Sequence, residues 1–161
     1  MIISNLNEMR DFANEFAVLL KDNDVINLIG DMGAGKTTLT NFIAEYFGIN
    51  DSSSPTFAIV NIYEGDKTIY HLDLYRLDDP DELLELDYET YFYPEDAITF
   101  LEWAENGAGF LPNDMINVEL SKVDPNTREI KILDDTKRGQ EINEYFSNWH
   151  LNYDFYCDYC K

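Results

Sequence analysis

The sequence predicts an α/β protein with three layers and a mixed, largely parallel central sheet. The apolar, β-branched run at residues 25–29 is typical of a buried parallel strand. A glycine-rich segment, residues 30–37, follows it directly. Apolar side chains then recur at helical spacing until Gly48, which can end a helix. Strand, glycine loop and helix in this order indicate the P-loop NTPase fold.

The glycine-rich segment matches the pattern G-x-x-x-x-G-K-[ST] at every fixed position. Glycines let such a loop turn its backbone N–H groups toward a polyphosphate, and the positive end of the following helix adds to this anion site. We therefore expect a nucleoside triphosphate, with the Lys36 ammonium on its β- and γ-phosphates and the Thr37 hydroxyl on Mg²⁺. The expected nucleotide contacts are Asp31, Met32, Gly33, Ala34, Gly35, Lys36, Thr37 and Thr38.

The composition limits the possible partners. The formal net charge of −21, from 32 acidic and 11 basic residues, repels phosphate backbones, so we expect no strong direct binding to nucleic acid. The acidity either attracts a basic partner or only keeps the protein soluble. No apolar run approaches the ~20 residues of a membrane helix, and the N-terminus lacks signal-peptide features. We expect a cytoplasmic protein.

The remaining elements follow from periodicity. Residues 7–20 carry an apolar stripe at helical spacing, so we expect a helix that Asn7 caps and that lies beside the first strand. Later apolar runs separated by turn residues predict two hairpins, a buried strand and short helices. The expected ranges are strands 56–63 and 68–74 around a turn at 64–67, a helix at 80–86, a strand at 97–101, strands 115–120 and 128–133, and a helix within 136–161.

Two carboxylates stand where a P-loop enzyme needs acids, at the carboxyl ends of strands. Glu102 directly follows the strand at 97–101. Asp73 lies near the end of the strand expected at 68–74, where alternation places His71, Asp73 and Tyr75 on one face. From spacing alone, each acid either holds Mg²⁺ and orients the nucleophile or is an ordinary solvated side chain.

Three further features leave their alternatives open. His71 has either a catalytic or a structural role. Arg76 contacts the γ-phosphate or a partner, or else forms a surface ion pair. Cys157 and Cys160 are too few for a zinc site, and neither histidine stands at a diagnostic spacing, so we assign them no role.

Four blocks of sequence carry a resemblance to a known family. They are GDMGAGKTT at residues 30–38, SPTF at 54–57, HLDLYRL at 71–77 and LEWAE at 101–105. Their wording, order and spacing closely resemble TsaE (YjeE), over roughly residues 6 to 134. The resemblance implies a Mg²⁺-dependent ATPase that is slow alone and required for threonylcarbamoyladenosine modification of tRNA. It also implies a protein partner, the TsaD–TsaB heterodimer, which TsaE binds and resets without performing the transfer itself.

The resemblance also implies roles for individual residues. Lys36, Asp73 and Glu102 would be catalytic, and Thr37, Glu102 and Asp73 would serve the metal. Thr56, in a loop that resembles a switch near the γ-phosphate, would contact the nucleotide. We expect a P-loop ATPase domain at residues 1–135. For the extension at 136–161 the family implies no role, and it is either a helix packed on or beside the domain or a surface for a partner or weak self-association.

Two other functions remain as alternatives. A small-molecule or nucleoside kinase uses the same loop, although the sequence shows no arginine-bearing lid between Arg10 and Arg76. A nucleotide-gated binding module would bind ATP without turnover. A GTPase is disfavoured because the guanine-reading pattern Asn-Lys-x-Asp is absent from the sequence.

Overall fold

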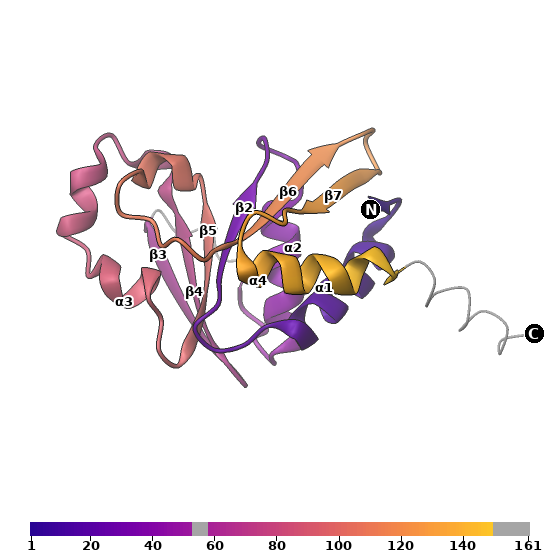
Figure 1. Ribbon diagram of the computed structural model, residues 1–161, viewed down its shortest axis with the longest axis horizontal. Coiled ribbons are helices and arrows are strands. Elements are labelled where there is room, and N and C mark those ends of the chain that lie inside the picture. The colour runs from indigo at the N-terminus through magenta and orange to yellow at the C-terminus, as the bar shows by residue number, and fades with distance from the viewer. Residues whose placement is uncertain (53–57, 150–161) are drawn as a thin grey trace, which may run out of the picture.

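The computed structural model describes residues 1–52 and 58–149 (Figure 1). Its strands are β1 (Ile2–Ile3), β2 (Val25–Ile29), β3 (Val60–Glu64), β4 (Thr68–Asp73), β5 (Ala97–Glu102), β6 (Ile116–Lys122) and β7 (Arg128–Ile132). Within the described residues they form one sheet of order β1-β7-β6-β2-β5-β4-β3. Strands β6, β2, β5 and β4 run parallel to one another, whereas β3 pairs with β4, β7 with β6 and β1 with β7 in antiparallel fashion. The expected mixed, largely parallel sheet is confirmed.

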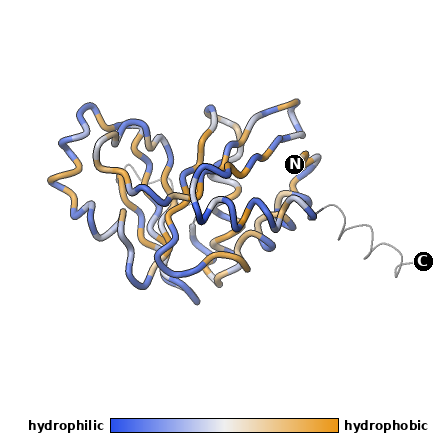
Figure 2. The backbone as a smooth tube through the Cα atoms, viewed as in Figure 1, coloured by the Kyte–Doolittle hydropathy of each residue, from blue (hydrophilic) through white to orange (hydrophobic). Residues whose placement is uncertain are grey.

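Helices cover both faces of this sheet. The α-helices are α1 (Leu6–Leu19), α2 (Lys36–Tyr46), α3 (Tyr88–Phe92) and α4 (Lys137–Ser147). The 3₁₀ helices are η1 (Leu74–Arg76), η2 (Pro80–Leu84) and η3 (Ala104–Gly107). In Figure 2 the hydrophobic residues follow the strands through the middle of the molecule, as a sheet buried on both faces requires.

Two groups of buried apolar side chains lie on the two faces of the sheet. Ile26 and Phe100 belong to the first group, while Val25 and Leu101 belong to the second, as alternation along a strand requires. Helices α1, α2 and α4 contribute to the first group, and α3 with the three 3₁₀ helices contributes to the second. The sheet therefore lies between a layer of long helices and a layer of short ones.

The start of the chain differs from the prediction in two ways. Helix α1 is capped by Asn5 and not by Asn7, because the Asn5 side chain accepts a hydrogen bond from the Glu8 backbone N–H at 3.0 Å. A cap needs extended backbone, which Asn5 has, whereas Asn7 already lies in the first turn. Strand β1 was not predicted, since two residues carry no periodicity. It pairs with β7 through Ile2 and Glu129.

The first hairpin is confirmed, but its first strand starts later than expected. Strand β3 begins at Val60 because β4 ends at Asp73, and the ladder therefore starts with the pair Val60 and Leu72. Residues 56 and 57 of the expected strand lie outside the described residues. The helix expected at 80–86 is the 3₁₀ helix η2, which Asp79 caps. Helix α3 is too short for its period to show in the sequence.

The predicted C-terminal helix forms as α4 and packs on α1. The ring centroids of Phe12 and Phe146 are 4.9 Å apart, and Phe12 also contacts Trp149 edge-on at 6.0 Å. Residues 150–161, with Cys157 and Cys160, lie outside the described residues. In the part of the chain that the structure describes, no helix has the length and apolar character needed to cross a membrane.

Candidate phosphate-binding site

The candidate site lies where three parallel strands end side by side. In the register of the sheet, Glu102 at the end of β5 is opposite Leu28 of β2 on one side and Asp73 of β4 on the other. The glycine loop leaves β2 at this edge and leads into α2. Ligands of open α/β sheets bind at the carboxyl ends of the strands. The topology thus brings the loop and both predicted acids together.

The loop conformation requires glycine at particular positions. Gly33 and Gly35 have φ angles of 83° and 107°, in the region that favours residues without a Cβ atom. At Gly30 the restriction is space, since a Cβ atom would stand 2.4 Å from the backbone oxygen of Leu120 on β6. The motif glycines therefore set both the turn of the loop and its close contact with the sheet.

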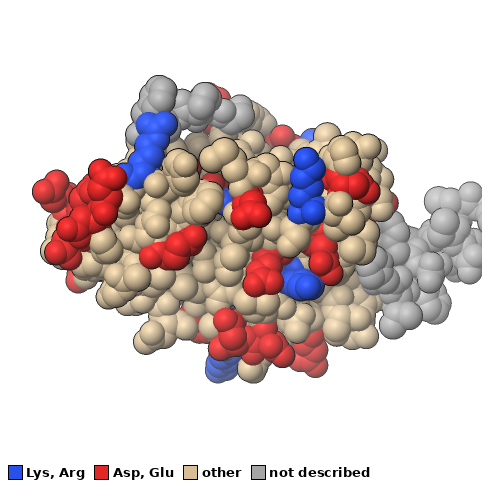
Figure 3. All heavy atoms as spheres, turned by 90° about the horizontal axis from the view of Figure 1, so that it is seen from above, with Lys and Arg blue, Asp and Glu red and all other residues tan. Residues whose placement is uncertain are grey.

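A cavity of about 320 Å³ opens between the loop and the strand ends. A pocket of this size is within the range of small-ligand sites. Figure 3 views the molecule from the side of the loop, and acidic side chains are spread over that face with few basic ones among them. The cavity is lined by Met32, Gly33, Gly35, Lys36, Thr37, Thr38, Asp73, Tyr75, Glu102, Trp103 and Arg128.

Lys36 is a buried cation without a carboxylate partner among the described residues. It is 6% exposed, its ammonium donates to the Gly30 carbonyl at 2.6 Å, and it lies 4.3 Å from the centre of the Trp103 ring. An ammonium has three donors, and the one hydrogen bond to Gly30 leaves capacity for an anion. The Trp103 backbone has a positive φ of 57°, which places its ring beside Lys36 at the end of β5.

Glu102 is a buried acid that, like Lys36, has no strong ionic partner among the described residues. It is 5% exposed, and one carboxylate oxygen accepts a long hydrogen bond of 3.5 Å from the Thr37 hydroxyl. The same oxygen is 3.5 Å from Nε2 of His71, a nitrogen with no hydrogen-bond partner among the described residues. His71 of β4 thus lies against Glu102 without a hydrogen bond between Nε2 and the carboxylate. The exposed Asp73 lies next to Glu102 in the sheet and accepts a hydrogen bond from the Tyr75 backbone N–H at 3.1 Å.

The oxygen donors here fit a magnesium ion. Thr37 and Glu102 present a hydroxyl and a carboxylate toward the same space, and Asp73 adds a second carboxylate at its edge. No group of three or more His, Cys, Asp or Glu residues suited to a metal occurs within residues 1–52 and 58–149. A magnesium ion here would therefore complete its shell with water and phosphate oxygens, as it commonly does.

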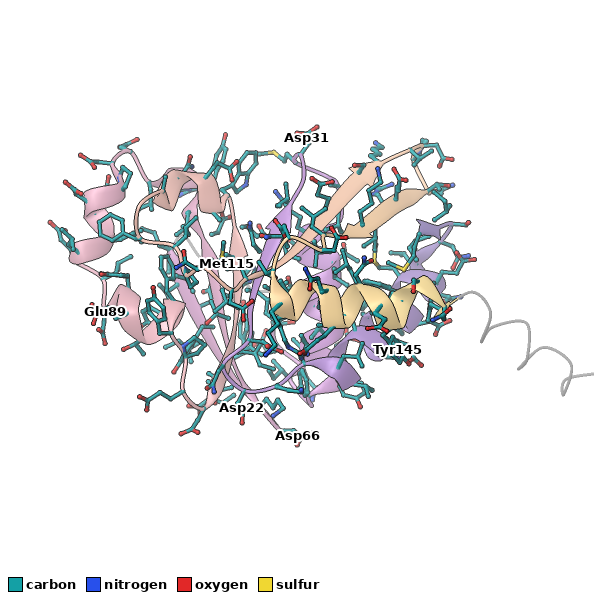
Figure 4. The ribbon with its side chains drawn as sticks, in the orientation of Figure 1. Asp22, Asp31, Asp66, Glu89, Met115 and Tyr145 are labelled. Atoms are coloured by element: carbon teal, nitrogen blue, oxygen red, sulfur yellow. The ribbon has the colours of Figure 1, made fainter. Side chains whose placement is uncertain are left out.

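Of the predicted contacts that the structure describes, all but two line this cavity. Ala34 is buried away from it, and its N–H donates to the Asp31 carbonyl within the loop turn. Asp31 points outward at the tip of the loop (Figure 4). Thr56 lies outside the described residues. Tyr75 lines the cavity from η1 and not from the strand face on which alternation had placed it.

One cation at the cavity was not anticipated. Arg128 begins β7, and its guanidinium donates to the Gly33 carbonyl at 3.3 Å. It is separated from the loop by more than 90 residues of sequence and stands in no motif. The only available signal was that arginine is rare in this chain.

The fold and the cavity define a mixed α/β protein with a glycine loop and two acids at the carboxyl edge of its parallel strands. Comparison with known proteins agrees. The family model described as "Threonylcarbamoyl adenosine biosynthesis protein TsaE" matches residues 3–130. The chain belongs to the TsaE family.

Individual relatives cover most of the chain. Two proteins named tRNA threonylcarbamoyladenosine biosynthesis protein TsaE are each 40% identical to it. The one from Rickettsia bellii aligns over 89% of this chain and 94% of its own length, and the one from Haemophilus influenzae over 87% and 92%. A crystal structure of Bacillus subtilis YdiB has a TM-score of 0.76 and 29% identity, and covers 93% of this chain and 94% of that one.

Proposed function

We propose that this chain binds and slowly hydrolyses Mg·ATP as an accessory protein in the biosynthesis of threonylcarbamoyladenosine in tRNA. The observation that carries the proposal is the convergence of Lys36, Thr37 and Glu102 in one cavity, each with unused binding capacity. Family membership supplies the biosynthetic context.

Each residue has a defined task in this proposal. The backbone N–H groups of the loop and the Lys36 ammonium bind the β- and γ-phosphates. Thr37 and Glu102 would hold Mg²⁺, which would supply positive charge to stabilise the charge that develops on the phosphate oxygens. Asp73 lies beside Glu102, where it can bind a metal-bound water or orient the attacking water. His71 packs against the Glu102 carboxylate.

The geometry of the site also supports the slow turnover that we propose. Phosphoryl transfer is accelerated by a positive group that stabilises charge on the γ-phosphate in the transition state. Apart from Lys36, the cation among the described residues that lines the cavity is Arg128, and it contacts Gly33 in the middle of the loop and not the acids. We infer that a protein partner completes the site, and the TsaD–TsaB heterodimer is the partner that we propose.

The net charge of the chain is consistent with a protein partner and not with direct tRNA binding. At −21 the surface repels a phosphate backbone, whereas a phosphate group inside the cavity meets Lys36, Arg128 and backbone N–H groups. In this proposal the chain works in the cytoplasm on the protein complex that modifies tRNA, and it does not transfer the threonylcarbamoyl group itself.

The test is ATP hydrolysis by the purified chain, alone and with the TsaD–TsaB pair from the same organism. We expect weak activity alone, a higher rate with the pair, and loss of both in Lys36→Ala. Magnesium chelation should remove the activity as well. If the pair neither binds nor changes the rate, the proposed partnership is wrong, and if Lys36→Ala retains ATP affinity, the proposed nucleotide site is wrong.

A further inference from the structure

The outer face of the short-helix layer exposes apolar side chains beside two hollows. Leu84 ends η2 and is 63% exposed, and Tyr93 follows α3 and is 59% exposed. The smaller hollow, of about 340 Å³, is lined by Leu84, Glu85, Leu86, Asp87, Tyr88 and Glu89. The larger hollow, of about 700 Å³, is lined by Tyr70, Glu89, Thr90, Tyr93, Glu95 and Asp96. Because Glu89 lines both, the hollows form one continuous surface, which we call the η2–α3 face.

Packing from beneath fixes the shape of this face. The Tyr88 ring contacts the rings of Phe92 and Phe110 edge-on, with centroids 5.8 and 5.1 Å apart. Tyr70 meets Tyr91 in the same way at 5.0 Å. Phe92 is fully buried in the second group of apolar side chains, and the other four rings pack against that group. The fold therefore holds the η2–α3 face in shape, and little ordering is needed when a partner binds it.

The charge on this face has one sign. Residues 78–96 contain nine carboxylates, and no lysine or arginine occurs in the sequence between Arg76 and Lys122. Figure 3 shows acidic side chains gathered at the end of the molecule that η2 forms, on the left in Figures 1 and 3, and in Figure 4 Glu89 projects from that end. The exposed apolar side chains of the η2–α3 face therefore stand in a strongly negative field.

An acidic and partly apolar face of this kind suits a basic protein surface. Lysine and arginine side chains carry the charge that complements the carboxylates, their stems cover apolar surface, and a guanidinium also stacks on a tyrosine ring. A second copy of this chain would bring its own net charge of −21, and a nucleic acid would bring phosphates, so both are repelled. Charge complementarity thus selects a protein that presents lysine and arginine around apolar contacts.

The η2–α3 face also lies on the segment that leaves the acid side of the phosphate cavity. Asp73 and Tyr75 line that cavity, and the chain continues from η1 into η2 after three residues. The Asn106 side chain ties η3 to η1, because it donates to the Leu74 carbonyl at 2.9 Å. Since Arg128 contacts the loop and not the acids, a partner that adds positive charge beside the acids would approach over η1. The same partner would then meet the η2–α3 face.

We propose that the η2–α3 face is the surface by which this chain docks on its protein partner, and that the occupant is a partner surface with lysine and arginine around apolar side chains. The proposal rests on the proposed function and adds to it the place where the partner binds. Ion pairs with the carboxylates orient the partner, and Leu84 and Tyr93 become buried in the contact.

The test measures the affinity of the chain for the TsaD–TsaB pair from the same organism, by biolayer interferometry with Mg·ATP present. One variant removes apolar contact from the face, Leu84→Ser with Tyr93→Ser. A second variant reverses charge on the face, Glu85→Lys with Glu95→Lys. All four side chains are exposed, so neither variant disturbs the core.

Two matched controls carry the same kinds of change outside the face. Val18→Ser with Val123→Ser removes exposed apolar side chains, which are 61% and 58% exposed. Asp134→Lys with Glu144→Lys reverses two exposed acids at the C-terminal side of the chain. The affinity for ATP and the hydrolysis rate of each variant without the pair are measured as well, because a merely misfolded variant would lose them.

We expect each face variant to weaken binding of the pair at least about tenfold, with ATP affinity and the hydrolysis rate of the chain alone within about twofold of wild type. Both controls should bind the pair within about twofold of wild type. Wild-type affinity should also fall more steeply than that of the charge variant as the salt concentration rises. The proposal is refuted if both face variants bind the pair as wild type does, or if the controls lose as much affinity as they do.

Two further outcomes are distinct from this one. A wild-type chain that does not bind the pair would refute the proposed partnership itself, whereas binding that the face variants leave intact would refute the docking surface alone. Sedimentation of the chain by itself tests another occupant. If wild type self-associates and the face variants do not, a second copy occupies the face and the proposal is wrong.

Discussion

The buried charged groups at the two ends of strand β2 differ in whether they have an ionic partner. At its amino end, Asp24 and Arg138 satisfy each other. At its carboxyl end, Lys36 and Glu102 are also buried, yet neither has a strong ionic partner within the described residues. The comparison separates an ion pair that holds the fold together from two buried charged groups that fit the proposed ligand.

The amino-terminal pair has good geometry on both sides. Arg138 Nε and Nη2 donate to the two Asp24 oxygens at 2.8 and 2.9 Å, and Nη2 also donates to the Leu19 carbonyl. The Lys21 backbone N–H donates to Asp24 as well, at 2.8 Å. The hydrogen bonds to Asp24 raise the pKa of Arg138 above its ordinary value. This network ties α4 to the turn between α1 and β2.

The carboxyl-terminal groups leave their capacity unused. The Lys36 ammonium has a carbonyl and an aromatic ring as neighbours, and Glu102 has contacts of 3.5 Å with Thr37 and His71. Burying a charge without a close partner costs stability, so such an arrangement is retained for function and not for folding. Substitutions at the amino end should therefore lower stability and leave ligand affinity unchanged. Substitutions at the carboxyl end should lower ligand binding or turnover and change stability little.

The largest effect on stability is expected at the amino end. Arg138→Ala should lower the free energy of unfolding by about 3–5 kcal/mol, because it leaves the Asp24 carboxylate buried and unpaired. ATP affinity, measured where the variant is still folded, should remain that of wild type. Urea denaturation gives the first quantity and calorimetry the second. The double variant Arg138→Met with Asp24→Leu should recover much of the loss, and a failure to recover would show that the ion pair is not the cause.

The opposite outcome is expected at Lys36. Lys36→Met removes a buried charge but keeps the stem of the side chain, so the free energy of unfolding should stay within about 1 kcal/mol of wild type or increase. ATP affinity should fall by about 100-fold or more, which corresponds to about 2.7 kcal/mol. A variant that lost several kcal/mol of stability would place Lys36 among the structural charges and remove the contrast between the two ends.

Glu102→Gln separates binding from turnover at the same end. The amide has the shape of the carboxylate but no charge, so we expect ATP affinity within about threefold of wild type and a rate of hydrolysis lowered by about 100-fold or more. Stability should change by less than about 1 kcal/mol. The readouts are single-turnover hydrolysis with the partner pair and thermal unfolding. Normal turnover would show that Glu102 does not serve the metal, and Asp73 would then be the acid to test.

Most of the site residues at the carboxyl end of β2 could be predicted from the sequence, because short local sequence patterns mark them. The loop motif, the strand before it and the acids at strand ends are short patterns with fixed spacing, and the structure brings Lys36, Thr37, Asp73 and Glu102 to one cavity. The contribution of Arg128 could not be foreseen. It depends on where the β6–β7 hairpin lies relative to the loop, which is a property of the tertiary fold.

The ion pair at the amino end could not be predicted from the sequence either, because it also depends on the tertiary fold. Asp24 and Arg138 are separated by 114 residues, and neither stands in a recognisable pattern in a chain with 32 acids. The short elements β1 and α3 have too few residues to show a period. The cap of α1 was assigned two residues too late because the apolar stripe does not mark where the backbone becomes extended.

The smallest expected effect on stability concerns a second, exposed partner of Arg138 at the amino end of β2. Arg138 also bonds to the exposed Glu141 at 2.8 Å, and this hydrogen bond lowers the pKa of the Glu141 carboxyl. A carboxyl whose pKa is lowered on folding adds stability above its unfolded pKa of about 4.3 and loses that contribution as the pH falls through the folded value. Wild type should therefore lose slightly more stability than Glu141→Gln between roughly pH 5 and pH 3. Urea denaturation of both proteins across this range measures the difference, with Glu144→Gln as the control on the same helix. Equal slopes would show that Arg138 acts through Asp24 alone, because an exposed partner is screened by solvent whereas the buried one is not.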